Sequence, residues 1–200
     1  MQIILLGGIQ MKKLFSMLLF ALMTSLLLIG CNTTNTSEKL TVTADGLTII
    51  SGETTLKEVL DQGYTYEFSK AFSPITEIEG KKFVSVCIVI KKDDKDFASV
   101  ALINKSSSKK TLEECTISDI WFYAYTDDKH ESDHNFSEIK INDENVIGLT
   151  KDQLKSKFDV EPKEYSDEIK FSYSGYAYEF KFDENNIVNF VGIDLDEYKQ

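Results

Sequence analysis

The sequence predicts an α+β fold in which two short capped helices each pack on antiparallel strands. Two segments carry a capping box, in which a threonine is followed three residues later by Glu or Gln. Short runs of β-branched and aromatic residues follow each box, and turn residues separate these runs at hairpin spacing. Each half is therefore predicted to be a helix followed by three strands, with tandem modules at 40–141 and 142–200.

The N-terminal stretch is an apolar run that ends in Leu28-Ile29-Gly30-Cys31. Lys12 and Lys13 supply a positive start, and the sixteen residues 14–29 are fewer than the roughly 20 that a spanning helix needs. This pattern resembles the lipobox of bacterial lipoproteins.

The resemblance implies cleavage between Gly30 and Cys31 and attachment of a diacylglyceryl lipid to Cys31, which anchors the chain to a membrane. We therefore expect residues 1–30 to be a signal peptide, with translation starting at Met11. Residues 31–39 are polar and would form a lipidated tether. The expected location is the extracytoplasmic face of the cell membrane.

Composition excludes one class of partner. The chain has 22 lysines, no arginine and 33 acidic residues, and removal of residues 1–30 changes its net charge from −11 to −13. Such a surface repels polyanions and lacks the bidentate guanidinium groups that suit phosphate, so nucleic acid is not an expected partner.

The first predicted module starts with a hairpin over 40–50 that turns at Asp45-Gly46. Thr55 caps the following helix, in which Leu56, Val59 and Leu60 form one apolar stripe that ends before Gly63. Strands are expected at 83–90, 97–103, 117–125 and 136–141.

The second predicted module repeats this order. Thr150 caps a helix whose inward residues are Leu154 and Phe158, and Pro162 lies beyond its end. The turn Ser174-Gly175 separates two strands. The strands expected in this half are 168–173, 176–182 and 187–193.

The segment Gly148-Leu149-Thr150-Lys151-Asp152-Gln153-Leu154, followed by Phe158, Pro162 and an aromatic hairpin, resembles the BLIP-like and BamE (SmpA/OmlA)-like superfamily of small envelope domains. The resemblance implies an α+β domain that binds other proteins, in outer-membrane assembly or β-lactamase inhibition. Asp159 replaces the family's glycine, and two residues rather than one separate it from Pro162. No functional residue of those families has a counterpart here.

The hairpin after this segment carries a row of aromatic residues that allows two interpretations. The row could be a docking platform for a glycan or a protein, or the inner face of a hairpin that covers a helix. The second is the more common arrangement, so we expect it here. The row consists of Phe171, Tyr173, Tyr176, Tyr178, Phe180 and Phe182.

The segment His130-Glu131-Ser132-Asp133-His134 matches H-E-x-x-H, the helical pattern of zinc proteases. It supports an alternative function, a metal-dependent hydrolase that uses His130, Glu131 and His134. However, residues 127–135 are entirely polar and offer no apolar stripe to hold such a helix. We therefore expect a solvated loop that performs no catalysis, contributes little to stability and holds no cofactor.

Two further cysteines, Cys87 and Cys115, leave two alternatives open. A disulfide is permitted outside the cytosol, whereas two buried thiols would serve as small apolar groups. With no catalytic residue identified, the sequence predicts a non-catalytic binding or interaction lipoprotein. Its expected partners are the membrane, through the lipid, and an envelope or secreted protein.

Overall fold

An antiparallel sheet of eight strands is the centre of the computed structural model, which describes residues 39–70, 72–124 and 134–195, without the side chains of residues 86 and 87. All neighbouring strands in this sheet are antiparallel. In spatial order they are β11 (Lys163–Glu164), β12 (Glu168–Tyr173), β13 (Tyr176–Phe182), β14 (Val188–Asp194), β8 (Thr116–Tyr123), β6 (Lys95–Asn104), β5 (Lys82–Lys92) and β3 (Thr65–Phe68).

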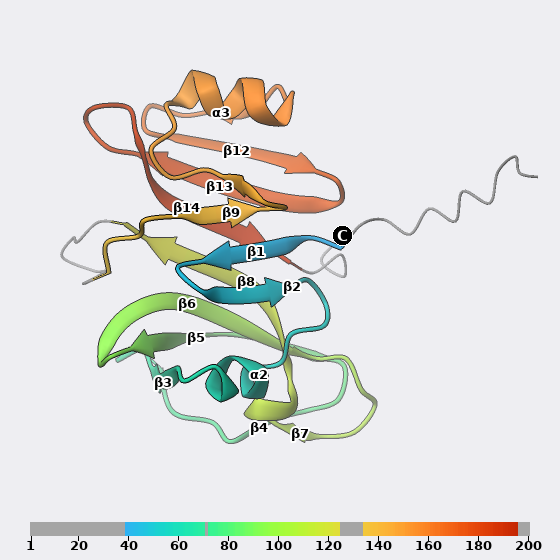
Figure 1. The fold of residues 1–200 in the computed structure, drawn as a ribbon. Helices are drawn as coiled ribbons and strands as arrows, with labels where there is room; N and C mark the ends of the chain where they lie inside the picture. The colour runs from blue at the N-terminus through green and yellow to red at the C-terminus, as the bar shows by residue number, and fades with distance from the viewer. Residues whose placement is uncertain (1–38, 71, 125–133, 196–200) are drawn as a thin grey trace, which may run out of the picture. The chain divides into compact units, whose positions relative to one another are not determined.

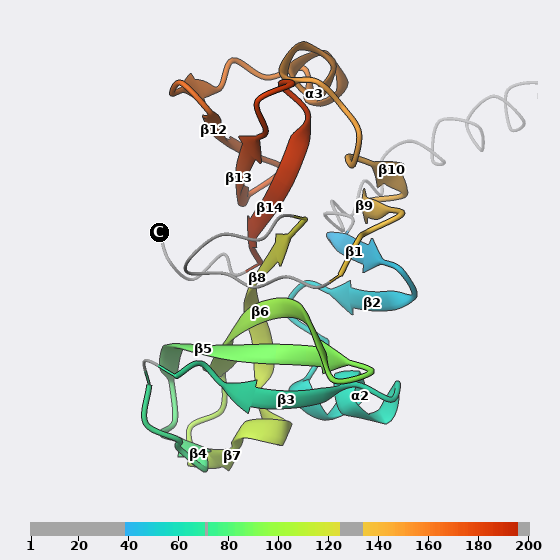
Figure 2. The ribbon, with the colours of Figure 1, turned by 90° about the vertical axis from the view of Figure 1, so that its left-hand side faces the viewer.

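A second layer covers one face of this sheet. It consists of two helices with a four-stranded sheet between them, and its apolar side chains join those of the large sheet in one core. The helices are α2 (Leu56–Asp61) and α3 (Lys151–Phe158), and the small sheet has the order β10 (Glu144–Asn145), β9 (Ile139–Ile141), β1 (Thr41–Ala44) and β2 (Leu47–Ile50). No described helix or strand packs on the opposite face along β12, β13, β14 and β8 (Figure 2). We call this the open face.

A smaller substructure lies near the β3 edge of the large sheet (Figure 1). It comprises the two-stranded sheet of β4 (Glu77–Ile78) and β7 (Lys110–Thr111), followed by the 3₁₀ helix η1 (Leu112–Glu114).

Both predicted helices are present, and both capping boxes form. In α2 the Thr55 backbone N–H donates to Glu58 Oε2 at 2.7 Å, and Thr55 Oγ1 accepts from the Glu58 backbone N–H at 3.3 Å. The same two bonds join Thr150 and Gln153 at 2.9 and 3.3 Å. Capping satisfies backbone donors that a helix leaves unpaired, which matters most for helices this short.

The predicted inward residues of the helices face the core. Leu56, Val59 and Leu154 have 0 % exposure, Phe158 has 6 %, and Leu60 is half-buried. The first hairpin and all three strands of the second half also lie where the sequence predicts them. Five short strands were not predicted, namely β3, β4, β7, β10 and β11.

The structure does not confirm two separate modules. Strand β14 pairs with β8, with Gly192 opposite Trp121, and β9 pairs with β1. Both sheets therefore contain strands from both halves of the chain, and the halves share one core. What repeats is the order of the main elements. Each half runs from a hairpin through a capped helix and a short strand to three antiparallel strands, and β4, β7 and η1 are additional elements of the first half. Corresponding strands, β8 with β14 and β1 with β9, meet at the centre of the eight-stranded and the four-stranded sheet.

The hairpin turns make reciprocal contacts across the small sheet. Asp45, in the turn between β1 and β2, accepts from the backbone N–H of Glu138 at 3.1 Å. Asn142, in the turn between β9 and β10, accepts from the backbone N–H of Thr41 at 2.9 Å. Each turn thus caps the start of the other hairpin.

The aromatic row forms the inner face of the hairpin β12–β13 and covers α3, as predicted. The ring of Phe158 on α3 has centroid distances of 5.3 Å to Phe171 and 5.8 Å to Tyr178. Every member of the row is buried except Tyr173, which is 42 % exposed.

Candidate functional site

The proposed lipidation and cleavage residues, Cys31 and Gly30, lie outside the described residues. So do His130 and Glu131 of the H-E-x-x-H segment. Among the proposed lipidation, cleavage and metal-binding residues, the structure therefore places only His134.

His134 is packed into the protein. Its ring centroid lies 4.7 Å from that of Phe97 and 4.6 Å from that of Phe136, and its Nε2 lies 2.7 Å from Asp45 Oδ2. The expectation that this segment is wholly solvated is wrong for His134, whereas the expectation that it contributes little to stability stays a prediction. The polar composition of residues 127–135 did not indicate this packing, because the apolar surface that His134 contacts comes from outside that run. It is provided by Phe136, just beyond the run, and by Phe97 on β6.

Asp45 collects several donors besides His134. Ser137 donates its hydroxyl to Oδ1 at 2.6 Å, and its backbone N–H lies 3.2 Å from both carboxylate oxygens. Burial favours a higher pKa for Asp45, but these hydrogen bonds outweigh it and lower the pKa below its ordinary value. The arrangement is a charged structural contact between two hairpins.

No described group of three or more His, Cys, Asp and Glu side chains could hold a metal ion. His134 faces Asp45 and two aromatic rings, and the other two residues of the H-E-x-x-H match are not described. The hydrolase alternative therefore has one placed residue and no assembled site in the described part of the chain.

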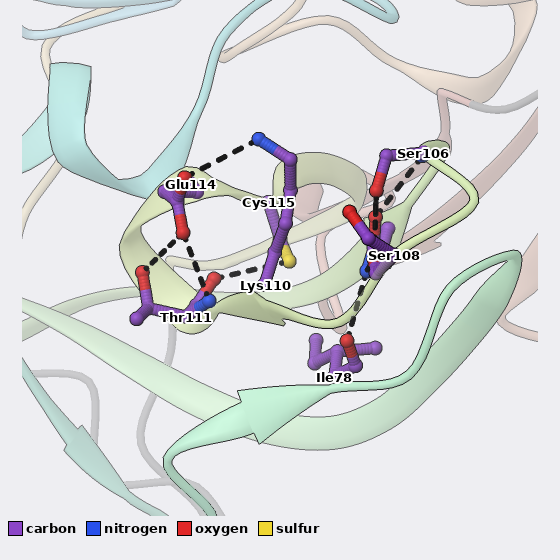
Figure 3. A network of polar contacts seen from close by, with 8 residues as sticks. Ile78, Ser106, Ser108, Lys110, Thr111, Glu114 and Cys115 are labelled. Carbon is purple, nitrogen blue, oxygen red and sulfur yellow. Dashed lines mark hydrogen bonds and ion pairs between the residues drawn. The ribbon is translucent and has the colours of Figure 1, made fainter.

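A polar network surrounds the loop between β6 and β7 (Figure 3). The Asn104 side chain is 1 % exposed, and its amide donates to the backbone oxygens of Ile78 and Ser108, both at 2.8 Å. Its oxygen accepts from Ser106 Oγ at 2.7 Å. These partners satisfy a buried amide and hold the loop against β4, so we assign the network a structural role.

Cys115 carries a free, buried thiol, and the side chain of Cys87 lies outside the described part of the structure. The thiol donates to the backbone oxygen of Thr111 at 3.2 Å (Figure 3). Burial raises its pKa, which keeps the group protonated and makes it a poor nucleophile.

The open face contains a hollow of about 400 Å³ over β12, β13, β14 and β8. This volume falls within the range of sites for small molecules, roughly 300–1,000 Å³. Its lining residues include Trp121 and Asp119 from β8, Gly192 and Asp194 from β14, and Ala177 from β13. We call it the Trp121 pocket.

The Trp121 indole lies over strand β14 because residue 192 has no side chain. A Cβ atom at Gly192 would lie 2.9 Å from Trp121 Cδ1, a distance that real Cβ atoms essentially never show. It would also lie 3.1 Å from Phe190 Cε1, which is closer than most real Cβ contacts. The Phe190 ring also makes an edge contact with Tyr123, with centroids 5.1 Å apart. The absence of a side chain at residue 192 therefore leaves room for the rings of Trp121 and Phe190.

Opposite charges on β12 and β13 pair with each other at the far side of the pocket. Lys170 Nζ lies 2.9 Å from Glu168 and 3.2 Å from Glu179, and Glu179 also lies 3.5 Å from Lys181. The remaining charged lining residues are Asp119, Asp194, Glu161 and Lys163.

Sequence reasoning missed this pocket, although two segments carry a signal. In Asp119-Ile120-Trp121 an acidic and an aromatic residue lie two apart, and in Gly192-Ile193-Asp194 a glycine and an acidic residue do, which puts each pair on one face of its strand. The pairing that brings the two segments together joins opposite halves of the chain and has no local signature.

Neither described helix is long and apolar enough to cross a membrane. Comparisons with protein-family models, with curated proteins and with solved structures give no match. The resemblance of 148–162 to BLIP-like and BamE-like domains therefore stays a prediction.

Proposed function

We propose that this protein is a lipid-anchored binding protein on the extracytoplasmic face of the cell membrane. The observation that carries the proposal is the sequence Leu28-Ile29-Gly30-Cys31 at the end of an apolar run with a basic start. Lipid attached to Cys31 would anchor the chain, and residues 31–39 would separate the folded part from the bilayer.

The binding role is supported by the open face of the large sheet. One face is covered by helices and the small sheet, whereas the other carries a pocket with a half-buried tryptophan. Tryptophan is enriched in binding sites because it offers a large rigid surface with a polar edge. The proposed partner is an envelope or secreted protein, in keeping with the resemblance of 148–162, and not nucleic acid, because the chain is strongly acidic.

The anchor is tested by replacing Cys31 with alanine. We expect the wild-type protein to fractionate with membranes and to carry a lipid mass on Cys31, whereas Cys31→Ala is released or remains unprocessed. Cys115→Ala is the matched control, because that buried thiol lies in the folded part and should leave fractionation unchanged. An unmodified Cys31 in the mature wild-type protein, detected by mass spectrometry, would refute the proposal.

We also propose that His130, Glu131 and His134 bind no catalytic metal. The support is the position of His134, whose Nε2 is already engaged by Asp45 at 2.7 Å. Titration of the full chain with Zn²⁺ by calorimetry should show weak binding or none. A tight stoichiometric site that His130→Ala abolishes, together with zinc-dependent cleavage of a peptide library, would instead support the hydrolase.

A further inference from the structure

We propose that a lysine-rich surface at one end of the folded part lies against the anionic headgroups of the bilayer to which the chain is anchored. This surface, which we call the lysine patch, consists of Lys81 and Lys82 at the start of β5 and of residues 105–110, the run Lys-Ser-Ser-Ser-Lys-Lys that leads into β7. The inference rests on the proposed lipid anchor and adds which side of the protein faces the membrane.

The two segments of the lysine patch are held against each other by backbone contacts. Lys81 donates its backbone N–H to the backbone oxygen of Ser106 at 2.9 Å and its ammonium to the backbone oxygen of Lys105 at 2.6 Å. A Cβ atom at Gly80 would lie 2.4 Å from the backbone oxygen of Ser107, so glycine is needed for this close approach. The polar network described above fixes the second segment against β4 (Figure 3). The fold itself therefore gathers these lysines.

The lysine patch carries positive charge on a strongly acidic protein. Lys81 and Lys82 are exposed and pair with no carboxylate in the part of the chain that the structure describes. Lys109 and Lys110 pair with three glutamates, so the five lysines of the patch together with these glutamates carry a charge of +2. The chain from Cys31 onward carries −13. An anionic bilayer repels most of this surface, so the anchored protein should turn the lysine patch toward the headgroups.

The tether joins the folded part beside the lysine patch. Leu40 follows the tether directly, and its backbone oxygen accepts from the Ser51 backbone N–H at 2.9 Å. The next residue, Gly52, lies against the patch, since a Cβ atom there would be 3.2 Å from Lys105 Nζ. The tether has nine residues and therefore spans at most about 30 Å. Lipid on Cys31 would thus keep this end of the protein close to the bilayer.

An exposed aromatic residue adjoins the lysines. Phe83 follows Lys82 on β5 and is 37 % exposed. Apolar side chains beside lysines suit the boundary between headgroups and acyl chains, because the lysine stems cover apolar surface while the ammonium groups reach the phosphates. An acidic protein would also match the charge of the patch, but the tether gives the bilayer the higher effective concentration there. We therefore assign the patch to anionic lipid.

The test measures how fast single lysines react while the protein is anchored. The chain from Cys31 onward, which contains the whole compact unit of residues 39–200, is coupled through the Cys31 thiol to a maleimide lipid. The vesicles contain phosphatidylcholine either alone or mixed with phosphatidylglycerol. An uncharged acetylating ester then labels exposed amines. Peptide mass spectrometry confirms coupling at Cys31 and gives the acetylation rate of each lysine.

We expect acetylation of Lys81 and Lys82 to be at least about fivefold slower on the anionic vesicles, since one lysine near such a surface strengthens binding by about that factor. The difference should shrink as the salt concentration rises. Lys95 is the internal control. It is exposed at the opposite end of the β5–β6 hairpin, about 30 Å along the strands, and its rate should be the same on both kinds of vesicle.

A double variant tests whether the two unpaired lysines hold the patch at the surface. Lys81→Gln combined with Lys82→Gln removes both charges, and Lys109, whose side chain is 49 % exposed, then serves as the reporter. Its protection on anionic vesicles should fall at least about fivefold in the double variant. Lys95→Gln is the matched control and should leave this protection unchanged. Thermal melts confirm that both variants fold.

Equal acetylation of Lys81 and Lys82 on both kinds of vesicle would overturn the inference and favour an acidic protein as the partner of the patch. Equal slowing at Lys95 would also overturn it, because the protein would then meet the bilayer with no preferred side. The result is independent of the anchor test, since the maleimide lipid replaces the natural lipid. A lipidated protein with an unprotected patch refutes the patch alone, whereas an unlipidated wild-type protein whose patch is protected after coupling refutes the anchor alone.

Discussion

Replacing Phe180 with alanine is expected to lower the free energy of unfolding by about 3–5 kcal/mol, the usual cost of truncating a buried aromatic residue. Phe180 has 0 % exposure, and its ring centroid lies 5.8 Å from that of Phe171 and 6.2 Å from that of Phe158. Truncation would leave a cavity between β13 and α3, where the rigid sheet cannot close it. Denaturant unfolding followed by circular dichroism measures the loss.

Tyr165→Ala is the matched control for Phe180→Ala. Tyr165 is also aromatic and lies on the same half of the chain, but it is 56 % exposed. Its truncation should change the free energy of unfolding by no more than about 0.5 kcal/mol, as is usual at surface positions. A cost at Phe180 as small as that at Tyr165 would contradict the packing of α3 on the β12–β13 hairpin.

The helices could be predicted from the sequence because their signals are local. Thr55 with Glu58, and Thr150 with Gln153, satisfy each other's backbone donors within one turn, so four consecutive residues carry the information. The hairpin β12–β13 was equally accessible, because Ser174 and Gly175 both have positive φ and form the turn that such pairs favour.

The short edge strands could not be predicted in the same way. Strands β4, β7, β10 and β11 have two residues each, which is too short for an alternating pattern to appear. Strands β11 and β10 form because a longer strand, β12 or β9, offers unpaired backbone groups, whereas β4 and β7 pair with each other. Tertiary context decides such elements, and the residues themselves carry little preference.

The strand pairing that joins the two halves of the chain also could not be predicted from local sequence patterns. Nothing in the residues of β8 specifies β14 as its neighbour, so the sequence equally allowed two separate sheets. The Trp121 pocket depends on this pairing, because the indole comes from β8 and the space for it from Gly192 on β14. A site assembled from distant strands remains invisible until the strand order is known.

The contacts of Asp45 likewise join distant parts of the chain and could not be predicted from its local sequence. Replacement of Asp45 is the second large loss of stability that we expect. The sequence marks Asp45 only as a turn residue, yet its carboxylate accepts hydrogen bonds from His134, Ser137 and Glu138. Hydrogen bonds to a charged group contribute about 1.5–3 kcal/mol each, and linked bonds do not add fully, so Asp45→Ala should cost about 2–4 kcal/mol. The turn conformation adds to this cost, since Asp45 has φ of 40° and alanine disfavours that region.

Asp45→Asn separates the charge from the turn conformation. Asparagine tolerates positive φ and keeps one acceptor oxygen, as Asn142 does in the corresponding turn with φ of 47°. We expect Asp45→Asn to cost about 1–2 kcal/mol at neutral pH, less than Asp45→Ala, because only the charge-assisted part of the bonds is lost. Equal costs for the two variants would show that the charge alone carries the contact.

The loss of stability in Asp45→Asn is expected to become smaller as the pH falls. Burial acts to raise the pKa of Asp45, but the hydrogen bonds from Ser137 and His134, and from the backbone N–H groups of Ser137 and Glu138, lower it below its ordinary value of 3.8. A carboxylate with a lowered pKa in the folded state stabilises the protein fully above its unfolded pKa, and this stabilisation is lost as the pH falls through the folded pKa. The stability difference between the wild-type protein and Asp45→Asn should therefore be complete at about pH 5 and shrink steadily below about pH 4.

Repeating the comparison in a His134→Ala background removes any contribution from the imidazole. If the difference in that background stays constant between about pH 5 and pH 2.5, the Asp45 carboxylate is not stabilised in its charged form by its hydrogen bonds, and the contact between the two hairpins is weaker than its geometry indicates.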